Sequence, residues 1–427
     1  MTSEPFGVNA FTAVSEALQP IELSAPRGAA RAVPRHFLFV TAPFGPFARE
    51  LAAGLRDGGV RCSRLLLSGG DLGDWGPAHA IGYFGGRRGF APWLARALRD
   101  HEVTDVIVHG DGSFYSGVGL AAAEAAGARR HVFEEGYFRP DWITLERNGV
   151  NRNSSLPRDP IAYLAAAPGL PERRATPLGR VTPPAVWRII AHHLWLYLLW
   201  PLFPGYRPPY STGVLRQAVG HTRRYLRQRL ARGTSPRPPT VEGPAFLVLL
   251  QRPGDSQLAG HAGAEGLAPF IAHVIASFGR CAPPETRLIF KAHPLDPGLE
   301  DHAASIVRAA RAHGAEGRVG YVDEGRLCDL LHSATGVITV NSTGGLAALE
   351  AGRPTLALGP AIYDLPGLTA QDGLDAFWRA AEAPEPALFA AFRRVVMATT
   401  QINGAFAQPL GRRLAVREAA RRLLASG

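Results

Sequence analysis

The sequence predicts an α/β protein made of two Rossmann-type halves that face each other across a central cleft. Three observations support this fold class. The chain has 427 residues and 46% hydrophobic content, which is too much for a single ordinary core. Short apolar segments alternate with helical segments in both halves, and such alternation is typical of doubly wound parallel sheets. A stretch rich in proline and arginine, residues 233–244, separates the two series.

The first half is expected to begin near Arg35, after a flexible N-terminal tail over residues 1–33. A helix is predicted at 48–57, where Gly58 and Gly59 end it. Another helix should run from the polar loop 110–113 to residue 126. The predicted buried strands of this half cover residues 36–41, 62–67, 105–109 and 130–133.

The second half repeats the pattern, and a C-terminal helix over 414–425 is expected to cross back to the first half. Its predicted strands cover residues 245–250, 287–291, 318–322, 336–340 and 355–358. The absence of a Gly-x-Gly-x-x-Gly loop after any strand argues against a nicotinamide dehydrogenase. The predicted divisions are a tail at 1–33, a first domain at 34–185, interdomain helices and a linker at 186–244, a second domain at 245–385, and C-terminal helices at 386–427.

The charge of the chain indicates an anionic partner. The formal net charge is +10 and the pI is about 10, which suits nucleic acid, phospholipid headgroups or a phosphorylated, carboxylated substrate. The chain has a single lysine, Lys291, so arginine supplies every other basic side chain. A lone lysine in such a chain indicates a position where a compact ammonium is needed.

The compartment is predicted to be the cytoplasm. Cys62, Cys281 and Cys328 are odd in number and widely spaced, which argues against a disulfide framework or a zinc site. The first thirty residues show no pattern of signal-peptide type.

An aromatic and aliphatic run at 194–203 is too short to cross a bilayer. Its Trp195, Tyr197 and Trp200 are residue types that settle at a lipid headgroup boundary, which predicts a peripheral contact with a membrane. The alternative is an interdomain helix packed into a core and followed by a solvated basic helix. The basic residues that follow are Arg216, Arg223, Arg224, Arg227, Arg229 and Arg232.

Four polar sets follow predicted strands, where ligands of open α/β sheets bind. The first is Glu134 and Glu135, after the strand that ends at Phe133. Like charge and partial burial would raise a pKa in this pair, which suits a general acid or base. The alternative is a glutamate pair that caps a loop beside Arg139 and Arg147.

The second set follows the first strand of the second half and contains Gln251, Asp255, Ser256 and Gln257. Pro253-Gly254 predicts a turn that leaves Asp255 at the mouth of the cleft. A carboxylate there can stabilise an oxocarbenium-like centre or attack it. An Asx-turn or a helix N-cap is the structural alternative.

The third set is Lys291, the last residue of the strand 287–291, with His293 and Pro294 directly after that strand. Because Pro294 keeps the histidine out of a helix, the imidazole can act as a donor to a phosphate leaving group, and Lys291 can add charge. A structural histidine is the alternative.

The fourth set is Asn341, Ser342, Thr343 and Gly344, which joins a strand to a helix. Free N–H groups at the helix start and two hydroxyls favour an anion, so this is the predicted phosphate cradle. The same residues would also form an ordinary helix cap.

Several longer motifs carry a family resemblance. They include residues 42–47 (APFGPF), 69–71 (GGD), 110–111 (GD), 361–368 (AIYDLPGL) and 400–404 (TQING). The most specific is FEEGYFRPDWITLERNGVN at 133–151. On these residues the chain resembles the capsule polysaccharide biosynthesis and export family of the KpsS type, whose members are similar to retaining β-Kdo transferases.

The resemblance implies a GT-B architecture that uses CMP-Kdo, with the nucleotide held by the second half and the acceptor by the first. By resemblance, Asp255 is the catalytic aspartate, and Glu134 or Glu135 is the acid/base. His293 and Lys291 are then contacts to the CMP phosphate, with Ser342 and Thr343 as hydroxyl donors. Family members of this type start the Kdo linker on a lysophosphatidylglycerol acceptor, which implies work at the inner-membrane surface beside other capsule synthesis or export proteins.

No metal and no cofactor are expected, because an arginine-rich cleft lowers the free-energy cost of binding a phosphate and a carboxylate. Two rival functions stay open. One is a CMP-sialic acid-dependent transferase, and the other is a non-catalytic capsule assembly or export adaptor. Nucleic-acid binding is not expected, because the arginines lack interleaved aromatic residues or a known binding module.

Overall fold

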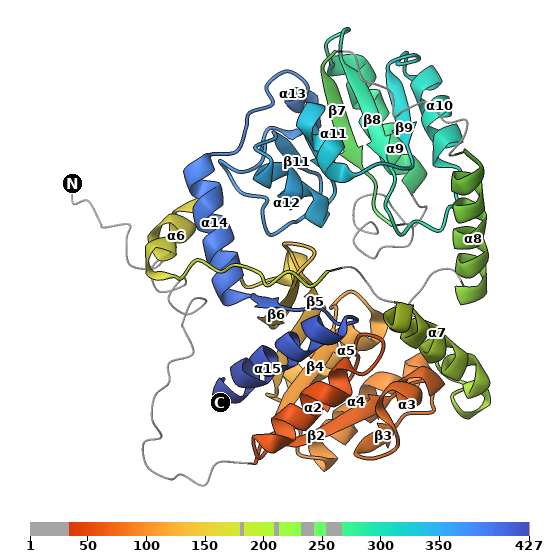
Figure 1. The fold of residues 1–427 in the computed structure, drawn as a ribbon, viewed down its shortest axis with the longest axis vertical. Helices are drawn as coiled ribbons and strands as arrows, with labels where there is room; N and C mark the ends of the chain where they lie inside the picture. The colour runs from red at the N-terminus through yellow and green to blue at the C-terminus, as the bar shows by residue number, and fades with distance from the viewer. Residues whose placement is uncertain (1–33, 180–182, 209–212, 232–242, 253–266, 427) are drawn as a thin grey trace. The chain divides into compact units, whose positions relative to one another are not determined.

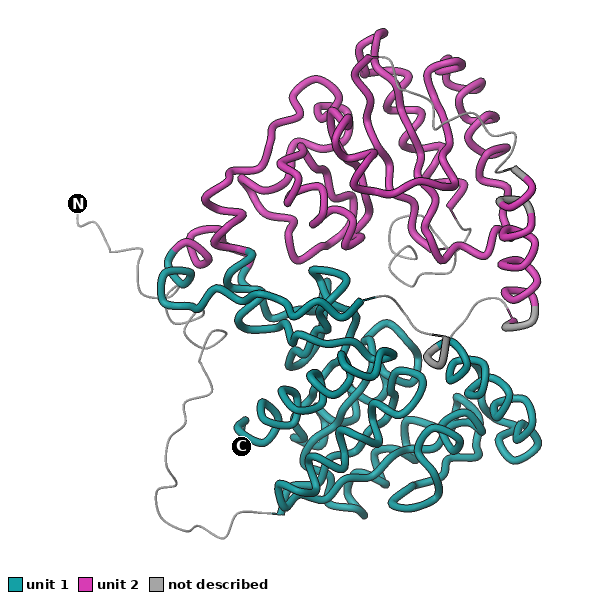
Figure 2. The backbone as a smooth tube through the Cα atoms, viewed as in Figure 1, with its two compact units in different colours: residues 1–157, 165–209, 393–427 teal, residues 158–164, 210–392 magenta. Residues whose placement is uncertain are grey.

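The computed structural model describes residues 34–179, 183–208, 213–231, 243–252 and 267–426 (Figure 1). The predicted tail 1–33 and the predicted site residues Asp255, Ser256 and Gln257 lie outside these ranges. The chain forms two compact units (Figure 2). Unit 1 contains residues 1–157, 165–209 and 393–427, and unit 2 contains 158–164 and 210–392. The segment predicted as linker, 186–244, is therefore divided between the units at residue 209.

Unit 1 is built on a seven-stranded sheet with the order β12-β6-β5-β4-β1-β2-β3. Its strands are β1 (His36–Phe39), β2 (Arg61–Leu66), β3 (Ala80–Gly82), β4 (Asp105–His109), β5 (Arg129–Glu135), β6 (Trp142–Arg147) and β12 (Gln401–Asn403). Its helices include α2 (Phe47–Asp57), α3 (Gly69–Trp75), α4 (Arg87–Asp100), α5 (Phe114–Ala125), α7 (Pro183–Leu198), the 3-10 turn η3 (Trp200–Leu202) and α15 (Pro409–Ala425).

The expectation of a wholly parallel sheet is wrong at one edge of unit 1. Strands β1 to β5 are parallel, but β6 pairs antiparallel with both β5 and β12. Only the segment 136–141 connects β5 to β6, and a parallel crossover needs a dozen or more residues. The short connection therefore forces a hairpin-like return.

Alternate residues of β1 and the residue after it show how the unit 1 sheet is covered on both faces. Phe37 and Phe39 pack with apolar residues of α2 and α15, whereas Leu38 and Val40 pack with those of α4 and α5. Successive side chains of a strand point to opposite faces, so this continuous apolar run needs helices on both sides. The C-terminal helix α15 belongs to unit 1, where it packs on α2 (Figure 1).

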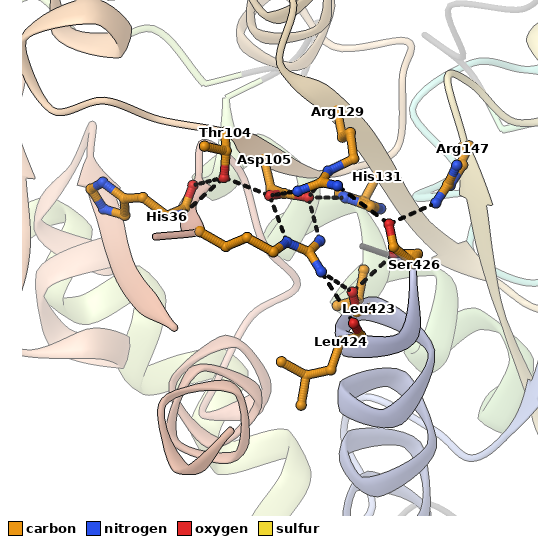
Figure 3. Close-up of polar contacts among 10 residues, drawn as sticks. His36, Thr104, Asp105, Arg129, His131, Arg147, Leu423, Leu424 and Ser426 are labelled. Carbon is orange, nitrogen blue, oxygen red and sulfur yellow. Dashed lines mark hydrogen bonds and ion pairs between the residues drawn. The ribbon is translucent and has the colours of Figure 1, made fainter. Parts of the chain in front are cut away.

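A buried carboxylate ties the beginnings of the unit 1 strands to the C-terminus (Figure 3). Asp105 is fully buried and accepts hydrogen bonds from Arg35, Arg129 and His131 at 2.7–3.2 Å. Arg35 also donates to the carbonyl of Leu423 at the end of α15. Burial raises the pKa of Asp105, but these three donors outweigh it and hold the pKa well below its usual range.

Unit 2 contains a five-stranded parallel sheet with the order β11-β10-β7-β8-β9. Its strands are β7 (Ala245–Leu249), β8 (Arg287–Lys291), β9 (Val319–Val322), β10 (Ala334–Thr339) and β11 (Thr355–Ala357). Its helices include α8 (Val214–Ala231), α9 (Leu267–Cys281), α10 (His302–Ala312), α11 (Leu327–Ser333), α12 (Thr343–Glu350) and α13 (Gly373–Phe377). Helices α6 (Pro160–Ala166) and α14 (Pro386–Thr399) each have residues in both units.

The central strand β7 of unit 2 is apolar on both faces. Phe246 and Val248 belong to one core cluster with residues of α9, α10 and α13. Leu247 and Leu249 belong to another cluster with residues of α11 and α12. Both units are thus Rossmann-like, and each has the parallel strand order 3-2-1-4-5 when its own strands are counted from one.

Replacing Asp105 with asparagine is expected to destabilise the protein by about 3–5 kcal/mol, because two guanidinium groups and a buried histidine lose their charged acceptor. Urea unfolding at pH 7 measures the loss. The exposed Asp100 supplies the control Asp100→Asn, which should change stability by less than about 0.5 kcal/mol.

The same pair of proteins has an expected pH dependence. A carboxyl whose folded pKa is lowered stabilises the fold above its unfolded pKa, and this contribution is lost as the pH falls. The stability difference between wild type and Asp105→Asn should therefore narrow as the pH drops below about 4. A difference that is constant from pH 7 to pH 3 would assign the carboxylate no electrostatic role.

Candidate functional site

The strand order of unit 2 defines one position where a ligand is expected. The chain runs from β7 to β8 and β9 on one side, and then returns to place β10 and β11 on the other side. Ligands of open α/β sheets bind at the carboxyl ends of the strands where this order reverses. That position lies between β7 and β10, which are followed by Gln251 and Asn341; we call these two residues the unit 2 switch point.

The two residues of the unit 2 switch point are joined by a hydrogen bond. The Nε2 of Gln251 donates to the Oδ1 of Asn341, as the topology predicts for residues that end neighbouring strands. Gln251 is only 5% exposed, and its Oε1 has no partner among the described residues. A buried acceptor without a donor is destabilising by about 1–3 kcal/mol. An N–H or O–H group of a ligand would satisfy it.

The predicted phosphate cradle is the N-terminus of α12. The Oγ of Ser342 caps the helix by accepting from the backbone N–H of Gly344 at 3.1 Å. This acceptor role leaves the hydroxyl proton of Ser342 for a donor interaction. Thr343 is the first residue of the helix, and a Cβ on Gly344 would lie 2.6 Å from Leu249 of β7. The glycine therefore allows the helix start to approach the end of β7 closely, beside the unit 2 switch point.

Lys291 is buried at the end of β8, where its Nζ donates to the backbone carbonyls of Ala292 and Asp323 at 3.2 and 3.1 Å. Burial lowers its pKa. These two bonds connect the segments that follow β8 and β9. The lysine thus has a structural role here that its position at the end of the strand did not predict.

His293 lies directly after this segment with a defined ring orientation. Its Nδ1 accepts from the backbone N–H of Leu295 at 3.0 Å. In the neutral ring the proton is therefore on Nε2, which makes that atom a hydrogen-bond donor. Pro294 contributes its carbonyl, which accepts from Arg224 at 3.3 Å.

Arg224 is the residue of this site that sequence reasoning missed. It was expected on an exposed basic helix, facing either a membrane or solvent, but it is buried and pairs with Asp323 at 2.8 Å. Its Nη1 donates to the carbonyls of His293, Pro294 and Asp296. The guanidinium therefore fixes the backbone that carries His293.

A sequence signal for this inward face existed in the glycine one turn earlier. A Cβ on Gly220 would lie 2.5 Å from the carbonyl oxygen of Pro297, so α8 approaches the loop after β8 at its backbone. Residues four apart share a helix face, which places Gly220 and Arg224 together. By contrast, Arg216, Arg223 and Arg229 are exposed.

Further basic groups surround the ends of β7 and β8. Arg252 follows Gln251 and donates to Gln217 of α8 at 2.5 Å. Burial lowers the pKa of His221, and the positive charges of Arg252 and Arg224 lower it further. Since opposite charge within about 4–6 Å favours an ionised group, this environment suits a ligand with phosphate or carboxylate groups.

In unit 1, Glu134 and Glu135 are the last two residues of β5, so the strand is longer than expected. Glu134 is partly buried and its Oε1 accepts from the backbone N–H of Glu135 at 3.0 Å, whereas Glu135 is exposed. The Oε2 of Glu134 lies against Gly110, where a Cβ would be 3.0 Å away. The two carboxylates therefore have different surroundings.

The arginines that a loop-capping role would use are bonded elsewhere. Arg139 donates to the carbonyl of Gly136 and Arg147 to that of Ser426. One group beside the glutamates was not foreseen: His109 ends β4, opposite Phe133 of β5. Its Nε2 is a buried atom without a partner among the described residues.

Fold and site together define a class: a protein with two Rossmann-like units, one of which presents basic and hydrogen-bonding groups at the switch point of its sheet. The family model of the capsule polysaccharide biosynthesis protein matches residues 104–407. The chain belongs to this family.

Relatives match along most of the chain. The capsule polysaccharide export protein KpsS of Escherichia coli is 33% identical over 381 residues, which cover 87% of this chain and 97% of KpsS. The capsule polysaccharide modification protein LipB of Neisseria meningitidis (serogroup A) is 31% identical over 389 residues, covering 87% and 91%. Among solved structures, the β-Kdo 2,7 transferase of Thermosulfurimonas dismutans KpsC aligns with a TM-score of 0.41 and 11% identity, over 91% of this chain and 99% of that one.

Replacing Arg224 with alanine is expected to loosen the segment 292–299, because three backbone carbonyls and Asp323 lose their donor. The expected loss of stability is about 3 kcal/mol. Hydrogen exchange followed by mass spectrometry should show faster exchange in 292–299 than in wild type. Arg223→Ala, at the exposed neighbouring position, should leave exchange in 292–299 unchanged. Equal exchange of this segment in both variants would contradict the role of Arg224 in fixing it.

Proposed function

We propose that the protein is a retaining β-Kdo transferase of capsular polysaccharide synthesis, which moves Kdo from CMP-Kdo to a lysophosphatidylglycerol acceptor to start the poly-Kdo linker. The observation that carries the proposal is the unit 2 switch point. Its Gln251 has a buried acceptor without a partner among the described residues, and the helix start at Ser342 and a basic environment lie beside it, in a member of a capsule family. A sugar nucleotide with a phosphate and a carboxylate matches these groups in charge and in hydrogen-bonding character.

The donor is held by unit 2 in this proposal. The start of α12, with Ser342 and Thr343, faces the phosphate, because N–H groups and hydroxyls at a helix N-terminus favour an anion. The Nε2–H of His293 donates to the phosphate of the departing CMP. Lys291 supports this position through the backbone bonds of Ala292 and Asp323, and adds positive charge.

The transfer itself needs one protein carboxylate beside the anomeric carbon of the sugar and another beside the acceptor hydroxyl. Asp255 stabilises or attacks the anomeric carbon as its bond to the CMP phosphate breaks, and CMP leaves with the bonding electrons. The acceptor oxygen then forms a bond to the anomeric carbon and displaces Asp255 where that residue has bonded to it, while Glu134 or Glu135 removes the proton from the acceptor hydroxyl. Because the leaving phosphate is met by protein donors, the reaction needs no metal and no cofactor.

The place of action follows from the acceptor. In this proposal the enzyme is cytoplasmic. Because a lysophosphatidylglycerol is embedded in lipid, the enzyme acts peripherally at the inner-membrane surface, beside other capsule synthesis and export proteins. Nucleic acid is not a partner in this proposal.

The first test measures product formation from CMP-Kdo, generated in situ, and a fluorescent lysophosphatidylglycerol, with the product mass recorded. The expected product has gained one or more Kdo units. Asp255→Ala and His293→Ala should each lower the rate by at least about 100-fold. Addition of a chelator should leave turnover unchanged.

The controls separate the alternatives. His313→Ala, at an exposed position at the end of α10, should retain the wild-type rate. Transfer from CMP-sialic acid in preference to CMP-Kdo would move the donor assignment to sialic acid. A capsule-deficient strain that is complemented equally by wild type and Asp255→Ala would show a non-catalytic adaptor.

The second test separates the two glutamates. Because Glu134 is partly buried beside Gly110 and Glu135 is exposed, Glu134→Gln and Glu135→Gln should differ in rate by at least about tenfold. Steady-state rates at saturating donor measure this difference. Equal and mild effects would assign both glutamates a structural role.

A further inference from the structure

Helix α7 and the turn η3 expose one continuous apolar face. Trp187, Leu194 and Leu198 are 67%, 65% and 63% exposed, and they recur at helical spacing with Ile190 between them. Soluble monomers rarely expose contiguous apolar patches of this kind without a function. We call this surface the α7 face; it consists of Val186, Trp187, Ile190, Leu194, Tyr197, Leu198, Trp200 and Leu202.

The opposite side of α7 is fixed to unit 1 through a pair of glycines. A Cβ on Gly69 of α3 would lie 2.3 Å from the carbonyl oxygen of Trp195, and one on Gly70 would lie 2.5 Å from the ring of His192. The Nδ1 of His192 pairs with Asp74 at 2.7 Å. These contacts hold the helix backbone against α3 in one orientation, so the exposed side chains stay outside the core.

The part of the sequence that carries α7 and η3 has basic but no acidic side chains. Residues 173–208 contain five arginines and no aspartate or glutamate. Arg188 lies on α7 and the exposed Arg207 follows η3. A second copy of this chain would bring the same positive charge against itself. An anionic surface is therefore the complementary partner.

The residue types on the α7 face fit a lipid boundary. Trp187, Tyr197 and Trp200 are the aromatic types that settle at the headgroup level, and leucine and isoleucine enter the outer acyl region. None of the described helices is long and apolar enough to cross a membrane. A helix fixed along one side and apolar along the other can lie in the plane of the interface.

We propose that the α7 face inserts into the headgroup–acyl boundary of an anionic bilayer and holds unit 1 at the membrane. This deepens the proposed function, since it names the element that brings the acceptor-side unit to a lipid acceptor. Within the run 194–203, Leu196 and Phe203 are buried whereas Leu194, Leu198 and Trp200 are exposed, so packing into a core accounts for only part of the run. Binding through the α7 face requires no catalysis, so it is measurable apart from transfer.

The test is co-sedimentation of the full-length protein with vesicles of phosphatidylcholine alone and of phosphatidylcholine with 30% phosphatidylglycerol. Wild type should bind the anionic vesicles at least about tenfold more strongly than the neutral ones, and added salt should weaken binding. Trp187→Glu and Leu194→Glu should each lower the partition coefficient by about tenfold or more, because a carboxylate enters the boundary. Val307→Glu, at a position of α10 that is also exposed, is the matched control and should bind as wild type.

Each outcome bears on the proposal. Wild-type partition in both Trp187→Glu and Leu194→Glu would overturn it. The proposal would also be overturned if the wild-type protein is a dimer that does not bind vesicles and Leu194→Glu dissociates this dimer in analytical ultracentrifugation. That result would show a protein interface. Unfolding curves of the variants that match wild type establish that the fold is intact.

A second readout separates this proposal from the proposed function. Leu194→Glu should keep its turnover with a short-chain, water-soluble lysophosphatidylglycerol and lose at least about fivefold with acceptor embedded in vesicles. Vesicle binding without transfer in any format would leave the α7 face in place and reject the transferase. Equal turnover of Leu194→Glu in both formats would count against the α7 face.

Discussion

The common direction of the five strands in unit 2 is the constraint on which its candidate site depends. Because β7, β8, β9 and β10 are parallel, their carboxyl ends, and the polar residues after them, share one edge of the sheet. Arg224 adds what the strands cannot provide. It reaches from α8 to the carbonyls after β8 and to Asp323 after β9, so a helix far away in the sequence fixes the loop that carries His293.

Much of this arrangement could be predicted from the sequence, because an apolar run followed by polar residues is a local signal for a strand and its end. The five strands of unit 2, four of the seven strands of unit 1, and the positions of Gln251, His293 and Asn341 follow from such runs. The strands β3, β6 and β12 were not predicted, and the antiparallel edge at β6 could not be inferred from the alternation of strands and helices, since periodicity does not reveal strand direction. Arg224 was expected to be exposed because an arginine among other arginines gives no sign of its burial. Only Gly220, one turn earlier, marks the packed face.

Buried ion pairs in this protein fix the arrangement of the segments that they join more than they add to the stability of the fold. Asp105 gathers Arg35, Arg129 and His131 at the strand beginnings, and Asp296 pairs with His302 beside the loop after β8 at 2.8 Å. A buried pair contributes little net stability over apolar residues of the same volume, but losing one partner is strongly destabilising. Such pairs therefore define single arrangements, one at the C-terminus of unit 1 and one next to His293.

Buried contacts also define a single orientation of helix α7, and this orientation keeps the α7 face exposed. A helix that exposed tryptophan and leucine by chance could rotate and bury them, since burying apolar area is favourable. Here rotation would drive the backbone of α3 into a side chain, because Gly69 and Gly70 leave room only for the carbonyl of Trp195 and the ring of His192. The His192–Asp74 pair would also break. Exposure of the α7 face is thus imposed by packing on its other side, and this exposure supports the proposed contact with lipid.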